Sequence, residues 1–340
     1  MSDPADPIRS SRFRREREAG WRRLDAIVTR VERSGAGALD FEEARDLALL
    51  YREALNALSV AREISLDKAL LAYLDALCCR AYLAVYAPRE RLGGVVRRFF
   101  TTGAPGAIRR SGLALALATL ALVLGAVAGF LLFREDSSWY STFMPGSLAD
   151  GRGPASSREQ LEAVLYDTGG SPLGELGAFA TYLFSHNTGI AILAFGLGVA
   201  ACLPSFLLAF YNGLILGVFA GLHADRDLGL DLFAWLSIHG VTELAAIVIA
   251  TAGGFRLGLA VLFPGRRTRR DALRHAGHDA AKLAVLAAVM LVAAALLEGF
   301  ARQLVTGIGP RIAIGWGVGA LWLGWLLLAG RGSAVREDGR

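Results

Sequence analysis

Cysteine is scarce in this sequence, and its three copies do not have the spacing of a metal centre. Cys78 and Cys79 are adjacent, and Cys202 lies alone in an apolar block. Because neighbouring positions on a helix point to different faces, the adjacent pair does not converge on one ion. We therefore interpret all three as small apolar residues, and we predict no metal site and no cofactor.

Signals for soluble catalysis, secretion and nucleic-acid binding are also absent. His239 and Glu243 form His-x-x-x-Glu, which lacks the second histidine of a His-Glu-x-x-His metalloprotease motif, so we predict no catalytic residues. The first 30 residues are Arg-rich without an apolar core, so we expect no cleaved signal peptide. No basic stripe is interleaved with aromatic residues, so the net charge of +5 predicts contact with anionic lipid and no nucleic-acid partner.

What the sequence does contain is long, uninterrupted apolar blocks. Hydrophobic residues make up 54% of the chain, the mean hydropathy is +0.43, and residues 113–133 carry no charge. A block of roughly 20 apolar residues can cross the hydrocarbon core as a helix. A lone apolar strand would leave its backbone groups unpaired in lipid. We therefore predict an all-α fold, that of a polytopic helical protein of the lipid bilayer.

The region 1–110 is predicted to be an Arg-rich cytoplasmic helical bundle. Apolar residues over 21–31 recur at three- and four-residue spacing, which is typical of an amphipathic helix. Asp40 and Glu43 have the spacing of a capping box and predict the start of a second helix. A third helix follows in the same pattern. In 91–100, arginines are mixed with apolar residues, and an interfacial helix and a fourth bundle helix fit equally.

The transmembrane domain is predicted to cover 111–330, with a charged tail over 331–340. We expect about six spans, with the approximate bounds 112–133, 187–203, 205–222, 236–263, 281–301 and 312–330. The hydrophilic stretch 134–186 then forms an outer loop. It holds three arginines and seven acidic residues.

Charge placement predicts the orientation of these spans. Arg109 and Arg110 precede the first span, and five arginines lie between 266 and 274, so both segments are expected in the cytoplasm. Splitting 187–222 at Pro204 gives three crossings between the outer loop and the second basic segment, which satisfies that rule. Both termini are then cytoplasmic.

Two arginines leave an alternative topology open. Arg302 and Arg311 fall on the outer side of the six-span arrangement, against the usual charge bias. In the alternative, 205–222 re-enters the membrane without crossing it, which leaves five membrane segments.

Polar residues inside a membrane are costly, so their positions are informative. The topology places five of them at one level toward the outer leaflet: His186, Asn187, His239, Glu243 and Glu298. Four-residue spacing puts His239 and Glu243 on one helix face. This layer could hold a proton or a cation, and hydrogen bonding between helices explains it as well. Arg256 is a buried charge that either reaches the cytoplasmic surface or needs a carboxylate or carbonyl partner.

Glycines recur every four residues in the third span, at Gly213, Gly217 and Gly221. Small residues at this spacing allow close helix packing, either within the chain or in a homodimer. Asn212, which precedes the first of them, could mark an unwound stretch of the kind transporters use. A hydrogen-bonded asparagine in a kinked helix fits equally.

Ordered short motifs along 13–300 resemble the stage II sporulation protein M family of bacterial membrane proteins. The N-terminal matches lie in the segments 13–24, 50–62 and 73–86. The membrane matches are His186-Asn187, Tyr211-Asn212-Gly213, His239-Gly240-x-x-Glu243-Leu244, Pro264-Gly265 and Glu298-Gly299-Phe300.

The resemblance implies a bacterial inner-membrane scaffold. In spore formers, the namesake belongs to an engulfment complex with peptidoglycan-degrading enzymes, which it recruits or holds at the membrane. In bacteria that do not sporulate, other members are expected to appear beside genes for MoxR-type AAA ATPases. The expected partners are therefore envelope enzymes, a cytoplasmic ATPase, or a second copy of this chain. The alternative function is a transporter or channel for an ion, a proton or a small solute.

Overall fold

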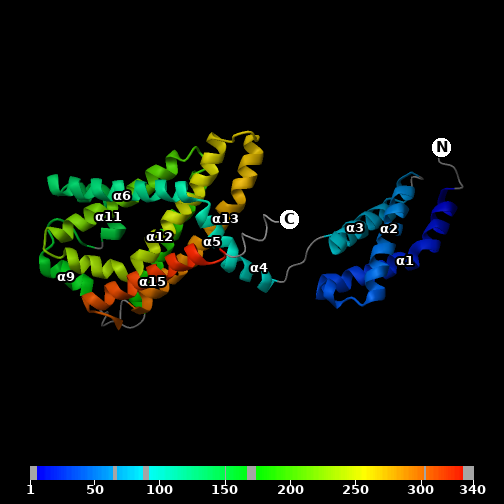
Figure 1. The fold of residues 1–340 in the computed structure, drawn as a ribbon, viewed down its shortest axis with the longest axis horizontal. Helices are drawn as coiled ribbons and strands as arrows, with labels where there is room; N and C mark the ends of the chain where they lie inside the picture. Colours follow the sequence, from blue (N-terminus) through cyan, green and yellow to red (C-terminus); the bar gives the residue numbers. More distant parts are fainter. Residues whose placement is uncertain are drawn as a thin grey trace. The chain divides into compact units, whose positions relative to one another are not determined.

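The computed structural model describes residues 6–63, 67–86, 92–149, 151–166, 174–301 and 304–331, and the structural statements below concern these residues. Within them the chain forms helices and no strand, which confirms the all-α prediction. Arg302 and residues 332–340 of the predicted tail lie outside the described residues. The chain divides into two compact units, Met1–Val95 and Val96–Arg340 (Figure 1).

The first unit is a bundle of three helices, α1 (Asp6–Ser34), α2 (Phe41–Glu63) and α3 (Lys68–Tyr86), with a short 3-10 helix, η1 (Ala36–Ala38), after α1. The predicted capping box at the start of α2 is confirmed: the Glu43 amide donates to Asp40 Oδ1 (2.7 Å), and the Asp40 amide donates to Glu43 Oε2 (3.4 Å). The apolar stripes of the three helices close one buried core that includes Leu24, Leu74 and Leu77.

Charged contacts join α1 and α3 at the edge of this core. Arg80 of α3 donates to Asp25 (2.6 Å) and, through two nitrogens, to the carboxylate of Glu32 (3.0 and 2.8 Å). Such charge-assisted bonds fix the relative register of two helices as well as adding stability. The bundle is therefore a defined three-helix unit with its own core.

A short helical segment leads into the second unit. It consists of α4 (Leu92–Arg98), the π-helix η2 (Phe99–Gly103) and α5 (Ala104–Arg109). No residue of α4 is buried, so α4 does not complete the three-helix core. By contrast, the first five residues of α5 are buried, and α5 packs on α13 and α15. The second unit consequently begins before residue 110, where the sequence analysis placed the domain boundary.

The second unit contains six long helices. They are α6 (Gly112–Glu135), α10 (Gly174–Leu197), α11 (Leu203–Ala224), α12 (Gly229–Leu262), α13 (Arg269–Leu296) and α15 (Ile308–Leu328). The π-helix η3 (Leu297–Ala301) continues α13. Three of the helices are longer than their apolar blocks: α10, α12 and α13 begin well before the predicted span starts, because their first turns are polar or amphipathic and extend beyond the apolar stretch.

Six described helices are long and apolar enough to cross a membrane, namely α3, α6, α11, α12, α13 and α15, while α10 contributes the shorter apolar stretch Phe184–Leu197. We assign α3 to the bundle instead, since its apolar face is buried against α1 and α2 and its surface carries Asp75 and Arg80. Exposed charges at mid-helix are costly in lipid. The multi-pass membrane architecture is therefore confirmed for the second unit.

Close helix packing in this unit depends on glycine. Helix α11 runs alongside α6 (Figure 1), and Gly213, Gly217 and Gly221 all face α6 within the same chain. A methyl group at Gly213 would overlap the carbonyl oxygen of Leu122, and one at Gly217 would overlap that of Ala126. The glycine stripe is thus occupied by intramolecular packing and is not a free homodimer face.

The segment after α6 folds back over one end of the unit. Its short helices are α7 (Trp139–Phe143), α8 (Gly146–Ala149) and α9 (Arg158–Tyr166). Leu161 and Leu165 are buried there with residues of α11 and α12. We call this the α9 end, and the opposite end, near the start of α6 and the α12–α13 connection, the Asp279 end. The described part of the predicted outer loop is therefore a packed layer.

Candidate functional site

A polar cavity lies between α10, α11 and α12, toward the α9 end. Its volume is about 160 Å³, and it is lined by Met144, Leu148, Arg152, His186, Asn187, Asn212, Ile215, Leu216, Phe219, Trp235, Leu236, His239 and Glu243. Four of the five residues that the sequence places in one polar layer thus surround one space. They come from two helices that are far apart in sequence, which requires the α10–α12 contact that the fold provides.

Among the described residues, Glu243 is the only carboxylate on the cavity wall. The side-chain amide of Asn187, on α10, donates a hydrogen bond to Glu243 Oε1 on α12. One turn earlier on α12, the buried ring of His239 meets Trp235 edge to face, with ring centroids 5.5 Å apart. Together with Arg152, the arrangement places one acid, one guanidinium, two imidazoles and two amides around a small volume, which suits a proton, an ion or a polar headgroup.

Arg152 closes the cavity from the α9 end. This buried side chain donates to the carbonyls of Ala149 and Leu148 (both 3.0 Å), and its guanidinium lies 4.9 Å from the centre of the Phe219 ring. Sequence reasoning missed Arg152, because it lies in the hydrophilic stretch after α6 and no local pattern shows that this stretch folds back onto the membrane helices.

The remaining predicted site residues lie differently. Helix α11 is continuous through Asn212, whose side-chain amide donates to the Leu208 carbonyl one turn earlier (2.9 Å), so there is no unwound stretch. Pro204 occupies the first turn of α11, where a proline is accommodated without a kink. Glu298 is buried in η3, which packs on α10 and α12, but it is not among the residues that line the cavity.

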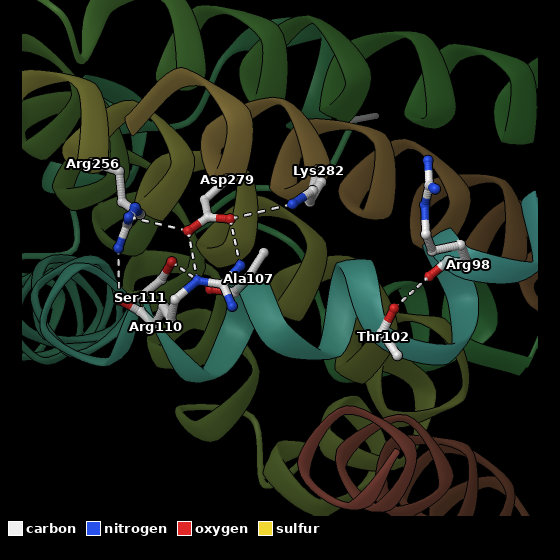
Figure 2. Close-up of polar contacts among 8 residues, drawn as sticks. All are labelled: Arg98, Thr102, Ala107, Arg110, Ser111, Arg256, Asp279 and Lys282. Atoms are coloured by element: carbon white, nitrogen blue, oxygen red, sulfur yellow. Dashed lines mark hydrogen bonds and ion pairs between the residues drawn. The ribbon is translucent and has the colours of Figure 1, made fainter. Parts of the chain in front are cut away.

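A second polar cluster at the Asp279 end supplies the partner for Arg256. As Figure 2 shows, Arg110, Arg256 and Lys282 converge on the carboxylate of Asp279. Arg110 binds it with two nitrogens (2.9 and 2.6 Å), Arg256 Nη2 donates to it (3.2 Å), and Lys282 lies 3.5 Å away. Arg256 Nη1 also donates to the Arg110 carbonyl (2.6 Å). Both partner types expected for Arg256 are therefore present.

Arg311 is accommodated at the α9 end by backbone carbonyls. Its side chain is buried and donates to the carbonyls of Val305 (2.8 Å) and Leu165 (3.1 Å). The neighbouring Tyr166 hydroxyl donates to Asp231 at the start of α12. That hydrogen bond, together with burial, raises the pKa of Tyr166 to about 12. These contacts fasten α9 to the membrane helices.

The described residues limit what chemistry the sites can perform. Among those searched, no group of three or more His, Cys, Asp or Glu side chains could hold a metal ion. The polar cavity has an acid and imidazoles, but its walls include no serine, threonine, cysteine or lysine that could act as a nucleophile.

Comparison with known proteins gives two family matches. A family model described as Stage II sporulation protein M matches residues 113–301, which is just over half of the chain. A model described as a domain of unknown function, DUF8413, matches residues 11–87. The two matches correspond to the two compact units. No curated protein and no solved structure in the comparison matches this chain.

Proposed function

Because this chain belongs to the stage II sporulation protein M family, we propose that it is a membrane scaffold and not an enzyme. The membrane unit anchors it, the α1–α3 bundle binds a cytoplasmic protein, and the layer of α7–α9 faces envelope enzymes. The observation that carries the proposal is the division into two units, one of which is a three-helix bundle with its own core.

The proposed sidedness follows from the charges. Arg109 and Arg110 and the basic segment 266–274 all lie at the Asp279 end, and the Trp325 end of α15 contacts the residues before α6. Positive charge favours the cytoplasm, so we place the Asp279 end, the bundle and both termini there, in a bacterial inner membrane. Six crossings by α6, α10, α11, α12, α13 and α15 are consistent with this.

The bundle offers one groove of suitable size for a partner. It runs between α1 and α2, has a volume of about 300 Å³, and is lined by Glu16, Arg17, Gly20, Trp21, Leu50, Glu53, Asn56, Ala57 and Val60. The lining combines apolar side chains with the carboxylates of Glu16 and Glu53, which outnumber the one arginine, Arg17, and this mixture suits an amphipathic helix that carries basic residues. We propose that the cytoplasmic partner, for which an AAA ATPase is the expectation, docks here.

Crosslinking in native membranes tests the scaffold. The tagged full-length chain is compared with Val60→Glu, which places a charge in the groove at a side chain that is already 43% exposed. Leu55→Glu is the matched control, since Leu55 is on the same helix, is 40% exposed and does not line the groove. A partner enriched over an unrelated polytopic protein should be lost in Val60→Glu and kept in Leu55→Glu.

Two results would count against this proposal. If no protein is enriched with the wild-type chain, the scaffold role fails. If the same partner is retained by both variants, the scaffold role stands but the groove is not the docking site.

The polar cavity supports a second candidate function, coupled movement or binding of a cation or proton. Glu243, with Asn187 and His239 beside it, is the specific observation that favours it. In liposomes, Glu243→Gln should lower proton or sodium flux at least tenfold, whereas Glu162→Gln, at an exposed position of α9 that does not line the cavity, should leave it unchanged. Wild-type flux equal to that of empty liposomes would end this candidate.

A further inference from the structure

The Asp279 cluster is positively charged overall. Arg110, Arg256 and Lys282 contribute three positive charges, and Asp279 contributes the one negative charge that they share (Figure 2). Both Asp279 and Arg256 are mostly shielded from water, with side chains 11% and 20% exposed. Charge at Arg256 is therefore screened less than at an open surface, and Arg110 and Lys282, which are 56% and 37% exposed, present the excess positive charge to an anion.

A cavity opens directly beside this cluster, between the starts of α6 and α13 and the end of α12. It has a volume of about 430 Å³ and is lined by Arg110, Ser111, Leu113, Ala114, Arg256, Leu259, Ala260, Phe263, Pro264, Arg267, Ala272, His275 and Ala276. Among the described residues, the side chains of Arg267 and His275 make no hydrogen bond or ion pair. Donors and positive charge thus line the cavity without a matching carboxylate of their own.

The rest of the cavity wall is apolar and exposed. Leu113, in the first turn of α6, is 67% exposed, and Phe263, at the end of α12, is 74% exposed. Both lie where the membrane helices begin or end. A site with arginines on one side and exposed apolar side chains on the other matches an amphiphile with an anionic head. A soluble anion would contact the arginines but would leave the apolar wall uncovered.

We propose that this cavity binds the phosphate headgroup of an anionic phospholipid, with Arg267 and Arg110 facing the phosphate and with Leu113 and Phe263 against the acyl chains. Basic pockets between membrane helices are a known way to select such lipids. The bound lipid would fill the cavity between α6, α12 and α13 and link the three helices through its headgroup.

Native mass spectrometry of the purified full-length protein tests the site, with phosphatidylglycerol and phosphatidylcholine offered as probes. Phosphatidylglycerol should bind at least tenfold more tightly. Arg267→Gln should weaken that binding about fivefold, because one basic residue near a lipid surface contributes roughly 1 kcal/mol. Arg266→Gln removes the same charge from the same exposed segment but does not line the cavity, and it should change binding less than twofold.

A further arm separates lipid from free phosphate. Inorganic phosphate at millimolar concentration should not displace bound phosphatidylglycerol, and Ala260→Phe, which fills the cavity without altering charge, should reduce lipid binding as Arg267→Gln does. Equal affinity for the two lipids, equal losses in the two arginine variants, or displacement by inorganic phosphate would each overturn the proposal.

Discussion

The carboxylate of Asp279 is surrounded by three cations. Replacing it should lower the stability of the protein, because the cations then repel one another without a counter-charge. Asp279→Asn keeps the shape but removes the counter-charge of Arg256, which is 20% exposed, and of Arg110, which is 56% exposed. Breaking a buried pair from one side costs about 3 kcal/mol, and solvent screening of the exposed Arg110 lowers the expected loss to about 2 kcal/mol. We expect that loss in reversible unfolding by sodium dodecyl sulfate in mixed micelles.

The double variant provides the control for this prediction. Arg256→Gln combined with Asp279→Asn removes one of the unpaired cations, so it should recover part of the lost stability. If the two losses simply add, the two residues do not interact and the shared-carboxylate interpretation is wrong.

Tyr166 gives a pH-dependent prediction at the α9 end. Tyr166→Phe removes the hydrogen bond to Asp231 and should lower stability by about 1.5 kcal/mol at pH 8, because a bond to a charged group contributes that much. The folded-state pKa of Tyr166 is raised to about 12 from an ordinary value near 10. Its contribution is therefore complete below pH 10 and is lost as the pH rises toward 12.

Unfolding measured from pH 8 to pH 11 checks this sign. The difference between wild type and Tyr166→Phe should be constant up to pH 10 and shrink above it. A difference that grows with pH would contradict the assignment.

The candidate site shows which residue-level facts a sequence can supply. The spacing of His239 and Glu243 and the predicted topology placed five polar residues at one level, and the structure brings four of them around one cavity, with Glu298 outside it. The sequence could not predict the partner of Arg256, because Asp279 lies on the next helix and the register between α12 and α13 depends on packing. Arg152 was missed for the same reason, since long-range folding of its segment has no local signal.

Glycine packing between α6 and α11 gives a prediction at the scale of elements. In Gly213→Ala the new methyl group would overlap backbone atoms of Leu122 and Ala126, which cannot move without separating the helices. We expect a stability loss of about 2 kcal/mol, typical of an overpacked interface. The measurement is again detergent unfolding.

Gly196→Ala, on α10, is the matched control, because nothing lies within 4 Å of a methyl group there. It should be neutral. Equal effects of the two substitutions would mean that the change reflects helix propensity in general and not the α6–α11 contact.

The membrane elements also show why boundaries are harder to predict than the number of spans. Apolar blocks locate the helices, but α10 ends at Leu197, several residues before the predicted position. A turn with positive φ at Ala201 and Cys202 intervenes there, and Gly198 lies directly against Gly254 of α12. The tertiary contact fixes this turn. Alanine and cysteine rarely adopt a positive φ, so the sequence at Ala201 and Cys202 does not predict the turn. The polar first turns of α13, which begin at Arg269, were likewise not visible to an argument from hydropathy.

At the scale of the whole molecule, the bundle should fold without the membrane unit. Its core is closed by α1, α2 and α3, and the family match to residues 11–87 ends where α3 ends. A fragment covering 1–87 should be soluble without detergent and strongly helical by circular dichroism, with a single cooperative thermal transition. Arg80→Ala, which removes the contacts to Asp25 and Glu32, should lower the midpoint of that transition.

A fragment that aggregates in water, or that is helical only in detergent, would contradict this interpretation. It would also favour the alternative that α3 crosses the membrane, which its length and hydropathy alone allow.

The orientation of the membrane unit is open to direct test by cysteine labelling. In a background without Cys78, Cys79 and Cys202, exposed positions are replaced singly: Ser137 before α7, Asp227 after α11, and Arg266 in the basic segment. An impermeant maleimide added to intact spheroplasts should label Ser137→Cys and Asp227→Cys, and it should label Arg266→Cys only after lysis. We expect this pattern because the positive charge at the Asp279 end favours a cytoplasmic location for that end, which the maleimide cannot reach in intact spheroplasts.

Asp227 is the decisive position. The adjacent Arg226 donates to the carbonyls of Ser156 and Pro154 in the layer before α9, so the end of α11 lies at the α9 end of the unit. If α11 crosses the membrane, Ser137→Cys and Asp227→Cys must label from the same side. Labelling of Asp227→Cys from the cytoplasmic side alone would restore the re-entrant alternative for 205–222 and would require α11 to separate from the α9 layer in the native membrane.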